Sequence, residues 1–280
     1  MSVWRLRDGL ELGFPPPLAA GVVNVTADSF YSGARSVTPE QAVADGVRLV
    51  EAGFDLLDVG AVAARSGPAV PPEDEAAKLA PGVAGLVERA GVPVLADTFS
   101  VPVARAALDA GAAGINDISG GSDEMFGLVA EAGCGYVLMH IEGPPRVDRP
   151  PPRYDDVVAH QLEWFGERIE AAIAAGVAAE AIALDPGPDF DKGVDDTLEL
   201  LRRLGELRSL GRPLFAAISR KDFLGAVVAG SWERRLEADE RGPATDAAAA
   251  IAVARGADIL RLHDVEALDA MRTAAAITHS

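Results

Sequence analysis

Eight short apolar runs recur along the chain, and each of them ends in a polar residue. Continuous apolar runs of this length are typical of parallel strands that are covered on both faces. The runs therefore favour a largely parallel α/β fold. The polar residues that end the runs are, in chain order, Asn24, Asp58, Asp97, Asn116, His140, Asp185, Ser219 and His263.

The segments between most of the runs have helical patterns rich in Ala, Leu, Glu and Arg, as in 39–53 and 245–256. Thr38 and Thr245 are the predicted N-caps of these two helices, and glycines close them. Eight β-α units in a chain of 280 residues predict one (β/α)8 TIM barrel domain over residues 1–280. A doubly wound open sheet is the alternative, but it usually has fewer strands, and no G-x-G-x-x-G follows the first run.

The N-terminal sequence M-S-V-W-R-L-R-D-G-L-E-L alternates apolar and charged residues around a D-G turn. This pattern predicts a short N-terminal hairpin and not a signal peptide. No run reaches the roughly 18 uninterrupted apolar residues that a membrane span needs. We therefore expect a cytoplasmic protein. The proline-rich stretch 144–154 is expected to form a long loop on the active face.

The formal net charge of −18 disfavours binding to nucleic acid and to anionic membranes, since both need a basic face. A small anionic substrate is still possible, because a few cations focused in one cleft outweigh a diffuse negative surface. Cys134 is the one cysteine, which excludes an internal disulfide and cysteine metal clusters. We expect its thiol to pack beside the next strand.

In a barrel, the polar residues that end the strands converge on one mouth, where the active site lies. Asp97, Asn116 and Asp185 offer carboxylate and amide edges for a flat heterocycle with adjacent donors and acceptors. Asn24 is a neutral oxygen ligand that suits Mg2+ carrying its own waters and a substrate phosphate. For His140, a hydrogen-bonded packing role is the alternative to a role in the site.

Cations gather at the ends of the last two runs. Lys221, Arg220, Arg261 and His263 form a basic set that is suited to phosphate or diphosphate. The alternative for Arg261 and His263 is a strand-end ion pair with Asp264.

The segment N-V-T-A-D-S-F at 24–30 resembles the first motif of the dihydropteroate synthase family, and the resemblance continues in chain order from about residue 20 to 270. The matching motifs fall at the ends of the predicted strands. They are D-V-G from Asp58, D-T from Asp97, I-N-D-I from Ile115, L-M-H from Leu138, L-D-P-G from Leu184, I-S-R-K from Ile218 and R-L-H-D-V from Arg261.

The resemblance implies the (β/α)8 fold, a Mg2+ cofactor and a homodimer. It also implies a reaction that joins 4-aminobenzoate to the methylene carbon of 6-hydroxymethyl-7,8-dihydropterin diphosphate and releases diphosphate in folate biosynthesis. The family mechanism is a dissociative substitution, in which diphosphate departs first and leaves a cation delocalised over the pterin. The aniline nitrogen of the second substrate then attacks this cation.

Residue by residue, the resemblance implies a role for each strand end. Asn24 is the implied metal ligand. The implied catalytic residues are Asp97, Asp185 and Lys221, and the two buried carboxylates would stabilise the pterin cation. The implied substrate-binding residues are Asp97, Asn116, Asp185, Phe190, Lys221, Arg261, His263 and Arg65.

Three departures from the family gather on the side where the second substrate enters. The loop A-V-A-A-R-S-G at 61–67 stands where G-E-S-T-R-P-G is usual, so it keeps Arg65 but loses hydrogen-bonding side chains. Asp222 replaces a small hydroxyl residue, and P-D-F-D-K at 188–192 replaces G-F-G-K. Such carboxylates repel a benzoate unless they are countered or protonated.

These departures leave three alternatives to an ordinary synthase. One is a paralogue that binds a pterin but condenses it poorly or uses a different, cationic or neutral, amine. Another is a non-catalytic pterin-binding protein, which the alanine-rich loop favours. The third is a pterin-dependent methyltransferase domain, but the retained I-S-R-K and R-L-H motifs suit a diphosphate leaving group.

Overall fold

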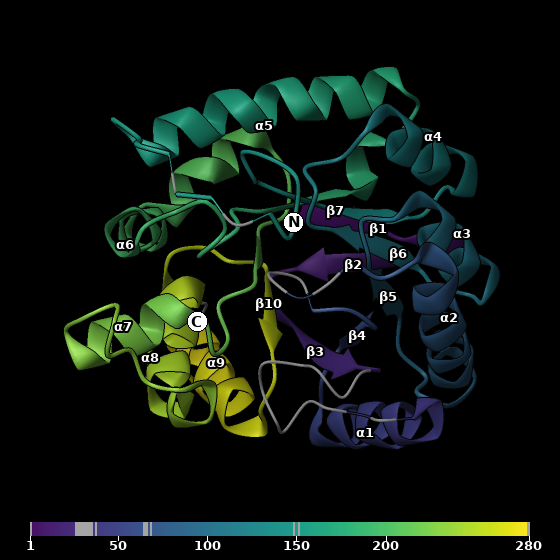
Figure 1. The fold of residues 1–280 in the computed structure, drawn as a ribbon, viewed down its shortest axis with the longest axis horizontal. Coiled ribbons are helices and arrows are strands. Elements are labelled where there is room, and N and C mark those ends of the chain that lie inside the picture. The colour runs from purple at the N-terminus through teal and green to yellow at the C-terminus, as the bar shows by residue number, and fades with distance from the viewer. Residues whose placement is uncertain are drawn as a thin grey trace.

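The computed structural model of the protein describes residues 2–25, 36, 38–63, 67, 69–147, 149–150 and 152–278. A hairpin is followed by eight strands that alternate with helices, so the predicted (β/α)8 barrel with a short N-terminal hairpin is confirmed (Figure 1). The barrel strands are β3 Leu18–Asn24, β4 Leu56–Gly60, β5 Val94–Asp97, β6 Gly114–Asp117, β7 Gly135–Met139, β8 Ile182–Asp185, β9 Phe215–Ala216 and β10 Ile259–Leu262. The helices are α1 Pro39–Ala52, α2 Pro72–Arg89, α3 Val101–Asp109, α4 Asp123–Ala132, α5 Val157–Ala174, α6 Val194–Arg202, α7 Asp222–Ala229, α8 Gly242–Ala254 and α9 Val265–Thr278.

The barrel strands are hydrogen-bonded in the order β8-β7-β6-β5-β4-β3-β10-β9, and their pairings are parallel. A parallel bridge between Leu184 and Leu214 joins β8 to the segment that leads into β9. There, the Leu184 amide donates to Pro213 O at 2.9 Å. In Figure 1, helices α1 to α9 lie around the strands. The sheet is therefore closed, and the C-terminal ends of its strands share one mouth.

Helix α1 begins where the sequence predicts. Thr38 has an extended backbone, and its hydroxyl accepts a hydrogen bond from the Gln41 amide at 3.3 Å. Gly53 ends the helix in the left-handed conformation, with φ 106°. The predicted N-cap and the glycine stop of this helix are both confirmed.

Helix α8 begins earlier than predicted, and the N-cap prediction for Thr245 is wrong. The helix starts at Gly242, because Pro243 lacks an amide hydrogen and its fixed φ suits the first turn. Thr245 is instead fully buried inside the helix. Its hydroxyl donates to Arg241 O at 2.9 Å and accepts from the Arg220 amide at 3.0 Å, so it ties α8 to the segment after β9.

The N-terminal hairpin closes one end of the barrel. It pairs β1 Ser2–Arg5 with β2 Glu11–Phe14 in antiparallel register. Trp4, Leu6 and Phe14 are buried against apolar side chains that the barrel strands point inward. Those inward side chains are Ala20, Leu56, Leu95, Val137, Ala183, Phe215 and Ile259.

Two contacts fix the position of the hairpin. Trp4 Nε1 donates to Ala181 O, just before β8, at 2.7 Å. A Cβ atom added to Gly135 at the start of β7 would lie 2.3 Å from Leu6 Cδ2. A larger residue at that position would therefore force the buried Leu6 side chain of the hairpin to shift.

Cys134 is 1 % exposed, and burial raises the pKa of its thiol to about 12. This confirms its predicted packing role.

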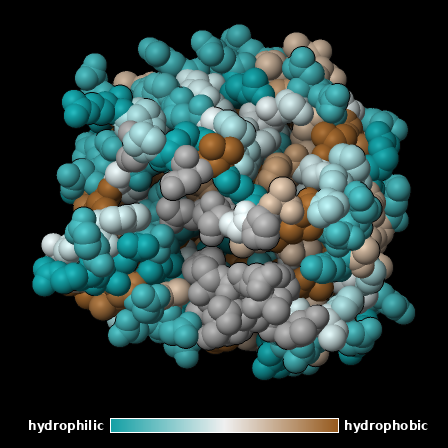
Figure 2. Space-filling view, viewed as in Figure 1, coloured by the Kyte–Doolittle hydropathy of each residue, from teal (hydrophilic) through white to brown (hydrophobic). Residues whose placement is uncertain are grey.

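Within the described part of the chain, no helix is both long and apolar enough to cross a membrane. Figure 2 shows hydrophilic side chains over most of the face in view, with hydrophobic ones among them in small groups.

We expect Trp4→Ala to lower the free energy of unfolding by about 4 kcal/mol, because it empties a buried site and leaves Ala181 O without its donor. Urea unfolding followed by circular dichroism measures the change. Leu10→Ala, at a side chain that is 44 % exposed, is the control and should change the value by less than about 0.5 kcal/mol. Equal effects of the two substitutions would contradict the plug role of the hairpin.

Candidate active site

A cavity of about 1000 Å³ opens at the C-terminal ends of the strands. Of the predicted site residues, all that lie in the described part of the chain line this cavity. They are Asn24, Asp97, Asn116, Asp185, Phe190, Lys221, Arg261 and His263. Arg65, the other predicted substrate-binding residue, lies outside the described residues.

The convergence of these residues follows from the period of two along a strand. The apolar side chains that fill the barrel next to the hairpin point inward, and so do the side chains two positions further along each strand. The inward pairs run from Leu56 to Asp58, Leu95 to Asp97, Val137 to Met139, Ala183 to Asp185 and Ile259 to Arg261. Each of these strands thus contributes an apolar residue to the core and, except for β7, an ionisable residue to the layer above it.

Arg261 lies across the floor of the cavity and contacts two carboxylates. Its Nη2 donates to Asp97 Oδ2 at 2.7 Å, and its Nε donates to Asp58 Oδ2. Asn116 Nδ2 donates to the same Asp58 oxygen at 3.0 Å. Burial disfavours the charge of Arg261, but Asp58 and Asp97 more than offset this and raise its pKa. The alternative of an ion pair between Arg261 and Asp264 is therefore wrong.

Asp264 instead pairs with Arg220, whose Nε lies 2.8 Å from Asp264 Oδ2. Arg220 also donates from Nη1 to Ala238 O at 2.8 Å. Its backbone is left-handed, with φ 56°, a conformation that costs a non-glycine residue energy and occurs often at functional sites. Arg220 was predicted to belong to the basic set, and it does line the cavity, but its guanidinium is largely committed to these protein contacts.

Asn116 presents an acceptor to the cavity. Its side chain is 3 % exposed, and its Oδ1 has no hydrogen-bond partner among the described residues, while its Nδ2 is fixed by Asp58. Buried amide oxygens are rarely left without a donor. This oxygen is therefore oriented to accept a hydrogen bond from a ligand N–H group.

Asp97 and Asp185 are the two carboxylates on the cavity wall. Burial raises the pKa of Asp97 to about 7, against the opposing effect of Arg261. Burial also raises the pKa of Asp185, against the opposing effect of Lys221. Asp185 Oδ1 accepts from the Gly187 amide at 2.8 Å, which fixes its orientation. Desolvated carboxylates of this kind interact strongly with positive charge on a ligand.

Lys221 and His263 lie on the cationic side of the cavity but differ in charge. Lys221 Nζ lies 4.2 Å from the centroid of the Phe190 ring, a cation–π contact. Burial, with Arg261 next in effect, lowers the pKa of His263 well below its usual range, so its imidazole is neutral. Its Nδ1 lies 2.8 Å from Ser219 Oγ. His263 was predicted as part of a basic set, but in this environment it offers a hydrogen bond and not a charge.

His140 is not among the cavity-lining residues. Its side chain is fully buried, and its ring lies against Trp164 with centroids 4.8 Å apart. His140 is therefore packed outside the cavity lining, but its ring nitrogens lack the hydrogen bonds of the predicted packing role among the described residues.

Asp222, an acidic departure from the family pattern, is paired with two arginines. Asp222 Oδ1 lies 2.7 Å from Arg241 Nη1 and 3.4 Å from Arg235 Nε. The expected repulsion of a benzoate by Asp222 is therefore countered by cations that were not assigned to the site from the sequence. Arg241 stands at the start of α8, so the pair depends on how two helices pack.

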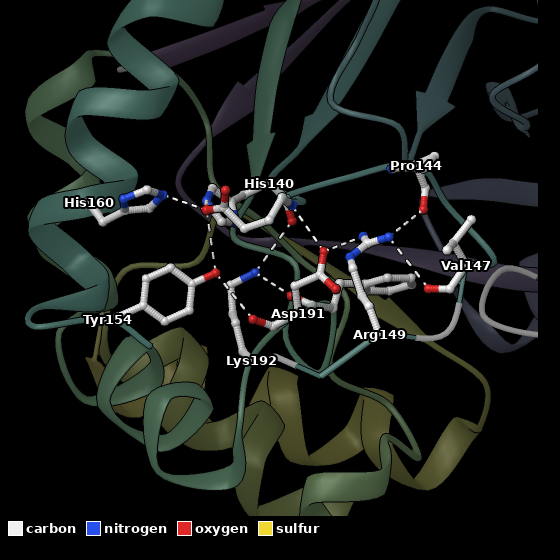
Figure 3. A network of polar contacts seen from close by, with 10 residues as sticks. His140, Pro144, Val147, Arg149, Tyr154, His160, Asp191 and Lys192 are labelled. Carbon is white, nitrogen blue, oxygen red and sulfur yellow. Dashed lines mark hydrogen bonds and ion pairs between the residues drawn. The ribbon is translucent and has the colours of Figure 1, made fainter. Parts of the chain in front are cut away.

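Asp189 and Asp191 stand where the usual G-F-G-K pattern has glycines, and both have a left-handed backbone, with φ 67° and 51°. Both oxygens of Asp189 accept from the Phe223 amide at 3.2 Å, at the start of α7. Asp191 Oδ2 accepts from the Glu142 amide at 3.0 Å and pairs with Arg149, as Figure 3 shows. These side-chain contacts stabilise the strained turn, and Arg149 counters the added charge of Asp191.

Sequence reasoning missed several residues of the site. Asp58 ends its run but was given no role, although it holds both Arg261 and Asn116 in place. Arg146 and Arg149 also line the cavity, from the proline-rich stretch that was expected to lie on the active face. The arginine spacing of that stretch was visible in the sequence, but which arginines face the cavity was not.

Lys192 is a further buried cation of the cavity wall. Its Nζ donates to Phe190 O at 2.7 Å, and burial lowers the pKa of Lys192 to about 7 despite nearby Asp185.

The described part of the 61–67 loop adds Val62, Ala63 and Gly67 to the lining. The loop thus contributes no hydrogen-bonding side chain there among the described residues.

The fold and the cavity define a (β/α)8 barrel protein whose cavity places buried donors and acceptors beside a cationic side. The chain matches the family described as pterin binding enzyme over residues 20–263. It is 38 % identical to dihydropteroate synthase of Mycobacterium leprae over 275 residues, which is 96 % of each chain.

Solved structures agree with this match. The chain is similar to Xanthomonas albilineans dihydropteroate synthase with 4-aminobenzoic acid, with a TM-score of 0.87, 39 % identity and 99 % of both chains covered. It is also similar to that enzyme in complex with 7,8-dihydropteroate, with a TM-score of 0.82, 36 % identity, and 98 % of this chain and 99 % of the other covered. The chain belongs to the dihydropteroate synthase family of pterin-binding enzymes.

We expect Asp58→Asn to lower the free energy of unfolding by about 3 kcal/mol at pH 8, because it removes a buried charge that pairs with Arg261. Denaturant unfolding measures the loss. Asp269→Asn, at an exposed position on α9, is the matched control and should be neutral within about 0.5 kcal/mol. Undiminished stability of Asp58→Asn would show that the pair with Arg261 is not formed.

Proposed function

We propose that this protein condenses 6-hydroxymethyl-7,8-dihydropterin diphosphate with 4-aminobenzoate and releases diphosphate, the dihydropteroate synthase reaction of folate biosynthesis. The observation that carries the proposal is the cavity itself. Asp97, Asn116, Asp185 and Lys221 line it together with Arg261, and these are the family's motif positions. Relatives of the same length and fold are named for this reaction.

In the proposed complex, the pterin ring lies among Asp97, Asn116 and Asp185. Asn116 Oδ1, which has no partner among the described residues, accepts from a ring N–H group, and the carboxylates bind adjacent N–H groups of the heterocycle. Lys221 and the Phe190 ring form the neighbouring wall. A ligand without this donor pattern would leave buried polar atoms unpaired, so the set selects strongly.

The proposed substitution is dissociative. The bond between the methylene carbon and the diphosphate oxygen breaks, and its electron pair leaves with the diphosphate. The lone pair of the aniline nitrogen then forms the new C–N bond, and the nitrogen releases a proton to solvent. Asp97 and Asp185, both desolvated, would stabilise the pterin cation between the two steps. Arg261 and the neutral His263 would contact the departing diphosphate.

Asn24 fits the proposed Mg2+ site. It ends β3 beside Gly60 of β4, and a Cβ added at Gly60 would lie 3.6 Å from both Asn24 Oδ1 and Asp97 Oδ2. The two oxygens therefore lie near each other at the ends of β3 and β5. Asp97 Oδ2 accepts from Arg261, whereas Asn24 Oδ1 is a neutral hard ligand that suits Mg2+ with waters and phosphate. When bound, Mg2+ would neutralise charge on the diphosphate. Asn24 would hold it from the protein side.

Arginines pair with Asp222 and Asp191, and this pairing favours 4-aminobenzoate over a cationic or neutral amine as the second substrate. Asp222 is held by Arg241 and Arg235, and Asp191 by Arg149. Asp222 and Asp191 therefore do not leave a net anionic wall where the benzoate carboxylate would approach.

The cytoplasmic location and the homodimer remain predictions. Val227 and Val228 of α7 and Ile251 of α8, which are about half exposed, support an interface on these helices.

The direct test of the function is incubation of the protein with pterin diphosphate, Mg2+ and 4-aminobenzoate. We expect equal amounts of diphosphate and dihydropteroate, and neither product when one substrate is omitted. Diphosphate release only with another amine would support the alternative acceptor and overturn the proposal. Calorimetric binding of the pterin diphosphate without turnover would indicate a non-catalytic pterin-binding protein.

The pKa of Asp97 predicts how the activity depends on pH. Because burial raises this pKa to about 7, the carboxylate is ionised, and able to stabilise the cation, only above that pH. We expect kcat/KM to fall about tenfold per pH unit below about 7 and to level off above it. Asp97→Asn should lose at least about 100-fold in kcat and also lose this dependence.

Ionisation of the substrate is the control for the pH experiment. Phosphorus NMR of the pterin diphosphate in the same buffers gives the pKa of the substrate. The kcat/KM values are then corrected for the ionised fraction of the substrate at each pH. A profile that stays flat between pH 6 and 8 after this correction would contradict the role of Asp97.

Asp222→Ser should improve the use of 4-aminobenzoate, because Arg241 and Arg235 lose one anionic partner and gain attraction for a benzoate. We expect KM for 4-aminobenzoate to fall about tenfold. This change needs much less energy than the ~4 kcal/mol with which two unit charges 4 Å apart interact near a protein surface. Steady-state kinetics at low salt measures the change, and high salt should reduce it. Asp222→Asn, of nearly the same shape, should behave in the same way.

Arg235→Gln is the matched opposite change, because it removes one of the two cations that counter Asp222. It should raise KM for 4-aminobenzoate and leave KM for the pterin diphosphate unchanged. An equal change in both KM values would show that the effect is not local to the second substrate.

A further inference from the structure

Two histidines and a glutamate form a cluster just outside the cavity lining (Figure 3). His140 follows β7, Glu142 lies in the next loop, and His160 lies in the first turn of α5. None of the three belongs to the proposed pterin, diphosphate or second-substrate contacts. Histidine nitrogens with a carboxylate oxygen are the donor set of many zinc sites.

The spacing of the donor atoms fits one shared ion. Glu142 Oε1 lies 3.3 Å from His140 Nε2 and 2.5 Å from His160 Nε2, and one donor atom of each residue lies within 4.8 Å of the others. Ligand atoms about 2.0–2.1 Å from a tetrahedral metal lie about 3.3 Å apart. The His140–Glu142 pair already has this separation. The half-exposed His160 side chain has to move back by less than about 1 Å.

A second observation points independently to a ligand. The His140 side chain is fully buried, yet neither of its ring nitrogens has a hydrogen-bond partner among the described residues. An unpaired buried imidazole is unfavourable. In a metal site, donor atoms point at a common centre and not at each other. This accounts for the poor hydrogen-bond geometry between His140 Nε2 and the Glu142 carboxylate oxygen 3.3 Å away.

We propose that His140, Glu142 and His160 bind a divalent transition metal, with Zn2+ as the best match to two imidazoles and one carboxylate. Glu142 and His160 are 27 % and 39 % exposed, so solvent reaches the site and supplies the fourth ligand as water. Tyr154 donates to the same Glu142 oxygen at 3.4 Å and would orient the carboxylate.

The ion would fix the loop between β7 and α5 at the mouth of the cavity. It would join the end of β7, the loop at Glu142 and the start of α5. The Glu142 amide in turn donates to Asp191 Oδ2, and Asp191 pairs with Arg149, a residue of the cavity lining. The role is therefore structural, and it is separate from that of the Mg2+ proposed near Asn24.

The test is a titration of the metal-free full-length protein, without a polyhistidine tag, with Zn2+ by calorimetry and with Co2+ by visible absorption. We expect about one ion per chain and the strong visible bands of four-coordinate Co2+, which excess Mg2+ does not remove because it prefers oxygen ligands. Zn2+ should also raise the melting temperature.

His160→Gln and Glu142→Gln should each weaken Zn2+ binding at least about 100-fold, since even a group that only orients a ligand contributes 10–100-fold. Both residues are partly exposed, so these variants should fold, whereas a change at buried His140 risks the core. Glu163→Gln, at an exposed position of α5, is the control and should bind as the unaltered protein does. Absence of binding, or binding that is unchanged in His160→Gln, would overturn the proposal.

Discussion

The site depends on one guanidinium that is shared between two buried carboxylates. Arg261 bridges Asp58, in the layer next to the core, and Asp97, on the wall of the cavity. A charge this deep in the protein is tolerated only when it is paired and hydrogen-bonded. Asn116 joins the same network through Asp58, so its remaining acceptor faces the cavity in a fixed orientation. The donor and acceptor pattern for a ligand is thus set before the ligand arrives.

The same burial that prepares the site costs stability. The pKa of the Asp97 carboxyl is about 7 in the folded protein against an ordinary value of 3.8, because burial disfavours its charge. The folded state therefore holds a proton that the unfolded state releases. The protonated Asp97 carboxyl therefore favours the folded state below about pH 4, and this stabilisation is lost as the pH rises to about 7. A desolvated carboxylate is useful for stabilising a cation for the same reason that it is unfavourable in an empty cavity.

Much of the fold and the floor of the site could be predicted, because both follow from local periodicity. Apolar runs give the strands, and the alternation along each strand places Asp97, Asp185 and Arg261 in one layer. Partners across the structure could not be predicted in this way. Arg261 pairs with Asp58 and not with Asp264, and Asp222 is countered by Arg241, 19 positions away at the start of another helix. These pairings depend on loop paths and helix packing, which no sequence period encodes.

A crystal structure of the protein with the pterin diphosphate, or a non-reacting analogue, shows directly whether this network prepares the site. We expect the pterin ring within hydrogen-bond distance of Asp97, Asn116 and Asp185. We also expect the Arg261–Asp58 contact to be unchanged and the diphosphate to lie beside Arg261 and His263. A pterin bound elsewhere, or one that displaces Arg261 from Asp58, would overturn this role of the network.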